Sequence, residues 1–251
     1  MRSAVKAKQS SPIGVHADTQ QLYFVWFEND RICSRAQPKD SPLSADLTAL
    51  LNTKQRHRRV VCAVPPQLVW SKSLILPQSL DADECEQQSR FILQKSLPVA
   101  LDELWFDYRA NSLPQGCRLE ITAIRQHLAL DFLQQFSPCQ PNILDTQVNS
   151  LLRAFTYLLQ QSVQNRLLVY IHGQQSLMLC ERAQQCQIRQ GGTDLQALYR
   201  DFQQYFKEPC EQIYVYSDIE RKLPADWQRV DCVCSPIALG NALWPKFEQG
   251  E

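Results

Sequence analysis

The side chains best suited to metal binding or redox chemistry in this sequence are its ten cysteines and four histidines. Cysteine thiolates and imidazoles are the usual ligands of zinc, and closely spaced cysteines also carry out disulfide exchange. Both chemistries favour short spacings such as C-x-x-C, and the sequence contains none. Several cysteines, including Cys62, Cys180 and Cys232, lie in apolar runs that predict strands, where a thiol behaves as a small apolar side chain. We therefore predict reduced, structural cysteines and no metal site.

The composition limits the class of protein. The chain has 251 residues, 44% of them hydrophobic, enough for one large domain or two packed lobes. Lysine plus arginine and aspartate plus glutamate both number 26, so the chain lacks the basic excess of nucleic-acid binders. No apolar run reaches the ~20 residues that span a bilayer, and residues 1–11 lack the apolar core of a signal peptide. We predict a cytoplasmic protein that does not contact nucleic acid directly and reaches a membrane only through a partner.

Hydrophobic periodicity predicts two passages with the same order of elements. The first has strands at 13–15, 22–27 and 31–35, a helix at 44–53 and a strand at 60–64. The second has strands at 166–171, 176–181 and 187–190, a helix at 193–206 and a strand at 212–216. Three strands, a helix and a further strand, occurring twice, predict an α/β protein with two lobes.

Two further helices have strong local signals. Asp81 and Glu84 have the spacing of a capping box, so a helix begins there, and Pro98 ends it. Thr146 is placed to cap a second helix whose apolar positions recur at helical spacing. These positions are Val148, Leu151, Leu152, Phe155, Leu158 and Leu159. The second helix is predicted to link the two passages and to contribute to the core.

The stretch from Ala63 to Tyr108 carries a family resemblance. Its order of two strands, a capped helix, a proline break, an acidic turn and a third strand resembles the corresponding segment of PilM proteins, the actin-like cytoplasmic proteins of type IV pilus assembly. A strand ending at Asp145 and a closing helix at 237–243 also resemble the family. The resemblance implies an α/β, actin-like fold of duplicated ribonuclease-H-like lobes with a PilM-type insertion. The first lobe would span 1–145, with the inserted subdomain at about 66–140, and the linking helix and second lobe would span 146–251.

Actin-like ATPases hold nucleotide between two hairpin loops whose backbone N–H groups face the phosphates. The first loop of the family resembles I-G-[LI]-D-[IL]-G-[ST] and is followed by a lysine; residues 13–23 are the equivalent here. The resemblance places His16 at the magnesium-organising aspartate, Asp18 at the turn glycine and Tyr23 at the lysine. A carboxylate beside a triphosphate repels it, by roughly 1 kcal/mol at ~4 Å in water and by several times more in a partly buried cleft.

The other nucleotide elements are also altered. In the second loop Tyr170 stands at the aspartate and His172 at the first glycine, and a tyrosine does not ligate magnesium as a carboxylate does. The adenosine turn, at 217–221, contains no glycine, and we interpret the retained glycines as turn positions of an inherited scaffold. The vestigial nucleotide-loop positions are Gly14, His16, Asp18, Thr19, Tyr170, His172, Gly173, Gly191 and Gly192. We predict that the protein is not an enzyme and uses neither ATP nor magnesium.

The second lobe is also short. Residues 193–212 leave room for one helix and a connector, where longer PilM proteins have a whole subdomain, so the second-lobe cap is predicted to be reduced or absent. Short, degenerate relatives of this kind resemble the HofM and ComA type found with competence and DNA-uptake pilus genes.

The resemblance implies an adaptor that binds the N-terminal cytoplasmic tail of PilN, a bitopic inner-membrane protein, as an extended peptide. The residues predicted to contact the tail are Trp70, Phe91, Leu97, Trp105 and Phe106. Two alternatives stay open. One is an actin-like ATP-binding switch or weak ATPase; the other is a thiol or metal enzyme with His16, His172 and Asp18 at its site.

Overall fold

The computed structural model describes residues 11–52, 59–114, 116–183 and 185–244. The first ten residues, where the sequence predicts no signal peptide, lie outside this described part. By its contacts the chain divides into two compact units, the first within 1–63, 133–154 and 233–251 and the second within 64–132 and 155–232. The predicted lobes met at residue 145, whereas this division groups the inserted segment with the strands after residue 155 and the closing helix with the first strands.

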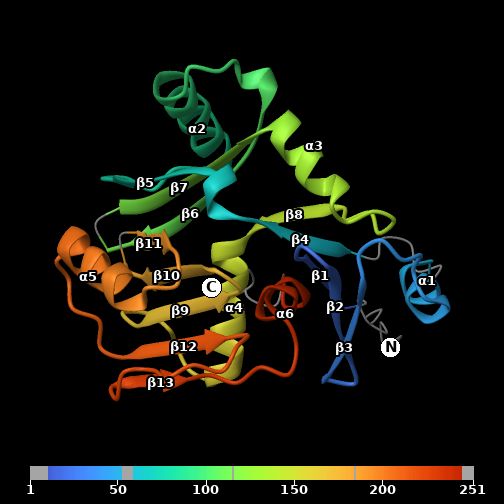
Figure 1. The fold of residues 1–251 in the computed structure, drawn as a ribbon. Helices are drawn as coiled ribbons and strands as arrows, with labels where there is room; N and C mark the ends of the chain where they lie inside the picture. Colours follow the sequence, from blue (N-terminus) through green and yellow to red (C-terminus); the bar gives the residue numbers. More distant parts are fainter. Residues whose placement is uncertain (1–10, 53–58, 115, 184, 245–251) are drawn as a thin grey trace, which may run out of the picture. The chain divides into compact units, whose positions relative to one another are not determined.

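The first unit contains a five-stranded sheet in the order β3-β2-β1-β4-β8 (Figure 1). The strands are β1 (Ile13–Ala17), β2 (Gln21–Glu28), β3 (Arg31–Pro38), β4 (Val60–Val64) and β8 (Ile143–Thr146). The helices α1 (Ala45–Asn52) and α6 (Pro236–Ala242) belong to the same unit. β1 pairs with β2 antiparallel and with β4 parallel. The β2–β3 turn has Asn29 at φ 48° and Asp30 at φ 61°, the left-handed pair that a tight two-residue hairpin requires.

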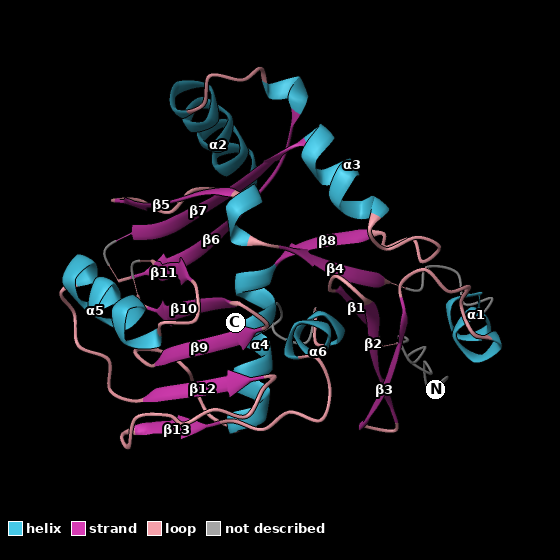
Figure 2. Cartoon of the chain, in the orientation of Figure 1, coloured by secondary structure: helices cyan, strands magenta, loops and turns pink. Residues whose placement is uncertain are grey.

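The second unit contains a sheet of the same plan, in the order β11-β10-β9-β12-β13 (Figure 2). Its strands are β9 (Leu167–His172), β10 (Gln175–Glu181), β11 (Cys186–Gly191), β12 (Ile213–Ser217) and β13 (Trp227–Arg229). As in the first sheet, the first three strands in sequence are antiparallel and the fourth pairs parallel with the first of them. The predicted duplication is therefore confirmed. Cys180 lies in β10 as predicted, but Cys232 lies beyond β13 and outside any strand, because the strand there ends at Arg229.

Helix α5 (Leu195–Phe206) covers one face of this second sheet. Its Leu195, Leu198 and Phe202 pack with apolar residues of β9, β10 and β12 to form the core. Only α5 and a connector separate β11 from β12, so the reduced second-lobe region is as predicted.

The inserted segment forms a three-stranded antiparallel sheet in the order β5-β7-β6. Its strands are β5 (Trp70–Leu76), β6 (Leu104–Leu113) and β7 (Gly116–Arg125), and two short 3-10 turns, η1 (Pro66–Leu68) and η2 (Leu101–Glu103), precede β5 and β6. Helix α2 (Ala82–Ser96) packs on one face through Cys85 and Leu93. The predicted capping box is confirmed: Asp81 Oδ1 accepts from Glu84 N at 2.8 Å, and Asp81 N donates to Glu84 Oε2 at 3.0 Å.

Two helices run across the division between the units, α3 (Gln126–Gln134) and α4 (Gln147–Leu159). α4 is the predicted linking helix, and Thr146 Oγ1 caps it by accepting from Asn149 N at 3.2 Å. Among the described residues, no helix combines the length and apolarity needed to cross a membrane.

Candidate functional site

The first vestigial hairpin joins β1 to β2 and is closed by Asp18. The Oδ1 atom of this residue accepts from the backbone N–H groups of Gln20 at 2.7 Å and Gln21 at 2.6 Å. Its Oδ2 accepts from the hydroxyl of Tyr23 at 2.8 Å. A phosphate-binding hairpin offers such N–H groups to its ligand, whereas here a carboxylate of the chain itself already accepts from them. The Asp18 carboxylate therefore takes the backbone N–H groups that a bound phosphate would need.

The other replaced residues of this hairpin support the same arrangement. His16 stacks on Tyr23 with ring centroids 5.7 Å apart. His16 Nδ1 shares a hydrogen bond of 2.9 Å with Ser235 Oγ, which also caps α6 by accepting from Ala238 N. His16, Asp18 and Tyr23 thus form a connected network at the positions that the family resemblance matches with the aspartate, glycine and lysine of an ATPase loop. Thr19, in contrast, is exposed at the tip of the turn.

Gly14 does not serve as a turn position, which corrects our interpretation from the sequence. It lies inside strand β1, and a Cβ added to it would meet the carbonyl oxygen of Ala238 at 1.9 Å. The glycine is required because the backbone of α6 lies directly against β1. Its role in the first unit is close packing.

The second vestigial hairpin joins β9 to β10 and is also closed by an aspartate. Gly173, at φ 56°, donates its N–H to Asp218 Oδ2 at 2.8 Å, and His172 Nδ1 lies 2.9 Å from the same oxygen. Asp218 N in turn donates to Ile171 O at 3.3 Å. Tyr170 stacks between neighbouring rings, with centroids 6.2 Å from His172 and 5.6 Å from Tyr216.

Asp218 is the site residue that the sequence analysis missed. It belongs to the segment 217–221, recognised only as an adenosine turn without glycine. The structure brings this segment to the second hairpin, where the Asp218 carboxylate accepts the N–H of the turn glycine. An acidic residue directly after a parallel strand adjacent to β9 is a signal that could have identified it.

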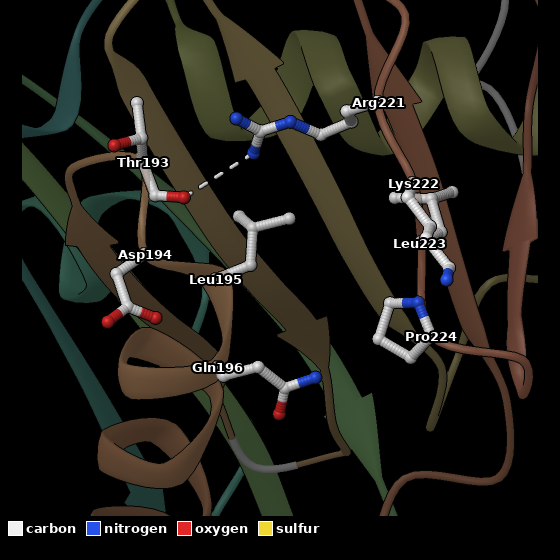
Figure 3. Close-up of a pocket in the computed structure, with 8 residues that line it drawn as sticks. All are labelled: Thr193, Asp194, Leu195, Gln196, Arg221, Lys222, Leu223 and Pro224. Carbon is white, nitrogen blue, oxygen red and sulfur yellow. Dashed lines mark hydrogen bonds between the residues drawn. The ribbon is translucent and has the colours of Figure 1, made fainter.

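Gly191 and Gly192 precede α5, whose N-terminus is capped by Asp194: its Oδ1 accepts from Ala197 N at 2.9 Å. A pocket of about 520 Å³ lies beside this helix start, lined by residues 193–196 and 221–224 (Figure 3). Arg221 extends across it and donates to Thr193 O at 3.5 Å. An anion site at a helix N-terminus needs free N–H groups. Here the Asp194 carboxylate already accepts from one of them, so it would repel a phosphate that entered the pocket.

Asp145, the next-to-last residue of β8, is likewise engaged within the chain. Its Oδ2 pairs with the guanidinium of Arg153, and its Oδ1 accepts from Thr146 N at 2.6 Å. The Asp145 and Arg153 side chains are only 10% and 9% exposed. Within the described ranges, no group of three or more His, Cys, Asp or Glu side chains is arranged to bind a metal ion.

The five residues predicted to contact a partner do not share one surface. Trp70, Leu97 and Phe106 are partly buried and pack into the core between α2 and its sheet. Trp105 is 40% exposed and lies on the opposite face, because neighbouring residues of a strand alternate sides. Phe91 is 55% exposed on α2. The structure therefore leaves Trp105 and Phe91 as the two exposed candidates.

Comparisons with known proteins agree with this architecture. A family model described as "Type IV pilus assembly protein PilM" matches residues 3–169. A solved structure of a "PilM-PilN type IV pilus biogenesis complex" is similar with a TM-score of 0.63 and 15% identity, covering 94% of this chain and 98% of that chain. No curated protein sequence matches the chain.

Two further solved structures are similar. The cytoplasmic domain of EpsL, an inner-membrane component of the type II secretion system of Vibrio cholerae, gives a TM-score of 0.57 and 11% identity, covering 95% of this chain and 100% of that chain. A Bacteroides thetaiotaomicron protein with an actin-like ATPase fold gives 0.43 and 15% identity, covering 88% and 86%. The α/β actin-like fold predicted from the sequence is confirmed.

Proposed function

The chain belongs to the PilM family of type IV pilus assembly proteins, and we propose that it acts as a cytoplasmic adaptor that binds the N-terminal tail of a PilN-like bitopic inner-membrane protein. The observation that carries the proposal is the similarity, over nearly the whole chain, to a structure solved as a PilM–PilN complex. The protein would be peripheral to the inner membrane through this partner and would not contact nucleic acid directly. The similarity to the cytoplasmic domain of EpsL supports this location. The short second lobe supports a place in the competence, or DNA-uptake, branch of the family.

We propose further that the protein neither hydrolyses ATP nor needs it. The two hairpins that present backbone N–H groups to nucleotide in actin-like ATPases have N–H groups bonded to aspartates of this chain, Asp18 and Asp218, and a third aspartate, Asp194, caps the helix that follows Gly191 and Gly192. Each carboxylate would have to be displaced before a phosphate could bind, and it repels the phosphate if it stays. The positions that organise magnesium hold His16 and Tyr170, and neither supplies a carboxylate.

An edge of the inserted sheet is suited to an extended peptide tail. β5 and β6 are both edge strands, because among the described residues each pairs only with β7 in the order β5-β7-β6. An edge strand offers unpaired backbone N–H and C=O groups, so a peptide gains main-chain hydrogen bonds by adding to the sheet. Trp105 lies near the start of β6 and is 40% exposed, which makes it the natural aromatic anchor for such a tail.

Calorimetric titration with a PilN-like N-terminal tail peptide tests the adaptor. We expect one-to-one binding with a Kd of about 1–10 μM, and we expect Trp105→Ala to weaken it at least about tenfold because buried aromatic anchors dominate such interfaces. Phe91→Ala reports on the α2 surface and is expected to leave the affinity unchanged. Tyr205→Ala is the matched control, since Tyr205 is 65% exposed on α5 outside the insertion. If folded protein gives no binding heat with the peptide, the adaptor proposal is contradicted. If only Phe91→Ala weakens peptide binding, the binding site lies on α2.

Titration of the same preparation with ATP and magnesium tests the second proposal. We expect no binding heat up to about 1 mM nucleotide and no phosphate release above the protein-free rate, because the hairpin N–H groups are already bonded. The peptide titration shows that the preparation is active. Micromolar ATP binding would instead favour the alternative of an actin-like ATP-binding switch or weak ATPase.

A further inference from the structure

Two cysteines of the second unit have their sulfur atoms in contact. Cys180 lies in β10 with no exposed surface, within the core between the second sheet and α5. Cys210 lies in the connector between α5 and β12 and is half-buried. The two Sγ atoms share a hydrogen bond at 3.8 Å, although 30 positions separate them in sequence. The fold has therefore brought two thiols that are distant in sequence into direct contact, which a disulfide between them requires.

The guanidinium of Arg182 lies beside this pair and fixes the connector. Its Nη2 donates to Pro209 O at 2.7 Å and lies 3.6 Å from Cys210 Sγ. Its Nε is 3.3 Å from Glu208 Oε2, and its Nη1 donates to Asn165 Oδ1 at 3.1 Å. Arg182 thus places a positive charge next to Cys210 and holds that segment against the end of β10.

The surroundings distinguish the two thiols. The pKa of Cys210 is lowered, first by the hydrogen bond with Cys180 and also by the charge of Arg182, against the opposing effects of burial and of Glu208. The pKa of Cys180 is raised by the same hydrogen bond and by burial. A thiolate is the reactive form of cysteine, so Cys210 is the nucleophile and Cys180 the resolving thiol. By contrast, burial raises the pKa of Cys139 to about 12, which makes it unreactive at neutral pH.

We propose that Cys180 and Cys210 are a site of reversible disulfide formation driven by peroxide. The Cys210 thiolate attacks one oxygen of hydrogen peroxide, the O–O bond breaks, and hydroxide leaves and takes up a proton as water. The Cys210 sulfenic acid that results is attacked by Cys180 sulfur, which forms the S–S bond. The sulfenic oxygen leaves as hydroxide and takes the Cys180 proton as a second water. Two thiols have then given two electrons to one peroxide, and a dithiol reductant reverses the change.

The bond would join the C-terminal end of β10 to the connector that leads out of α5. Closing a loop of this length restricts the unfolded chain and stabilises the folded one. The oxidised protein is therefore expected to melt at a higher temperature than the reduced protein. This inference does not depend on the identity of the partner or on nucleotide binding.

The test uses the reduced full-length chain with hydrogen peroxide in slight excess. We expect a product lighter by two hydrogen atoms, a Cys180–Cys210 linkage in the peptide map, and full reversal by dithiothreitol. In Cys180→Ala, a dimedone adduct should form on Cys210; in Cys210→Ser, neither linkage nor adduct should form on Cys180. Arg182→Gln should slow the reaction about fivefold by lowering the thiolate fraction of Cys210. Arg221→Gln removes an arginine at the pocket of Figure 3 and is the matched control; it should leave the reaction rate unchanged.

A wrong linkage or unreactive thiols overturn the proposal, and equal rates for the two arginine variants overturn the role given to Arg182. A linkage between any other two cysteines, or thiols that survive excess peroxide, shows that the contact is only packing. Equal rates for Arg182→Gln and Arg221→Gln show that Arg182 does not activate Cys210. Alanine is chosen at position 180 because it suits the apolar surroundings there, so the Cys180→Ala variant is expected to fold and the dimedone experiment stays valid.

Discussion

Replacement of Gly14 by alanine is expected to lower the free energy of unfolding by at least about 3 kcal/mol, the upper end of the range for overpacked cores. An added Cβ lies 1.9 Å from Ala238 O and 2.4 Å from Ala242 N, both backbone atoms of α6. Backbone atoms cannot rotate away as a flexible side chain can, so α6 must move off β1. Domains have only about 5–15 kcal/mol of stability, so the variant should lose a large part of it.

The effect is large because α6 is in close contact with backbone on a second side as well. A Cβ on Gly240 would lie 1.8 Å from Ser150 O, so α6 approaches α4 as closely as it approaches β1. Between these contacts Asn241 is fully buried, donates Nδ2 to Val15 O at 2.9 Å and accepts from Ser150 Oγ. Moving α6 away from β1 would also leave these buried polar groups unpaired, which adds to the cost. Gly240→Ala is expected to be similarly destabilising.

Urea denaturation followed by circular dichroism measures the effect. Gly192→Ala is the matched control, because the nearest atom to its added Cβ is Gln174 O at 3.9 Å. The control should stay within about 0.5 kcal/mol of the natural protein, as a surface substitution without special features does. If Gly14→Ala also lies within that range, the close approach of α6 to β1 is wrong.

Elements with local signals could be predicted from the sequence. The helix at Asp81 was predictable because both halves of its capping box lie within four residues, and α4 because Thr146 precedes a regular apolar stripe. The duplicated sheet plan followed from strand lengths and turns. Each of these predictions depends on residues that are neighbours in the chain.

Features made by distant segments could not be predicted in this way. Asp218 reaches Gly173 across 45 positions, and Gly14 meets a helix more than 200 positions later in the sequence. The residues predicted to contact the partner were proposed as one group, but strand alternation puts Trp105 and Phe106 on opposite faces of the inserted sheet. Which of these faces α2 covers depends on how the strands pair, and the sequence does not give that pairing. The sequence located both hairpins, but the approach of Asp218 to the second hairpin depends on the fold.

The buried pair of Asp145 and Arg153 is another such feature. Arg153 lies on α4 away from its apolar stripe but is still buried, where an unpaired guanidinium would be very costly. It pairs with Asp145, donates Nε to Gly240 O at 2.8 Å and lies 3.4 Å from Ser150 Oγ through Nη2. Asp145 therefore has a structural role in the first unit, which agrees with the proposal that the protein does not hydrolyse ATP.

Removing one residue of the Asp145–Arg153 pair is expected to lower the free energy of unfolding far more than replacing both. Asp145→Ala should lower the free energy of unfolding by about 3–5 kcal/mol because it leaves a buried, uncompensated charge. The double variant Asp145→Ala with Arg153→Met exchanges that charge for apolar volume and should recover at least about 2 kcal/mol of the loss. Arg90→Met is the control, since Arg90 pairs with Glu86 across half-exposed side chains and should cost under about 1 kcal/mol. Urea denaturation of the four variants, with Arg153→Met alone as the fourth, gives the coupling energy. Strict additivity of the two single effects would show that the pair does not hold α4 and β8 together through charge.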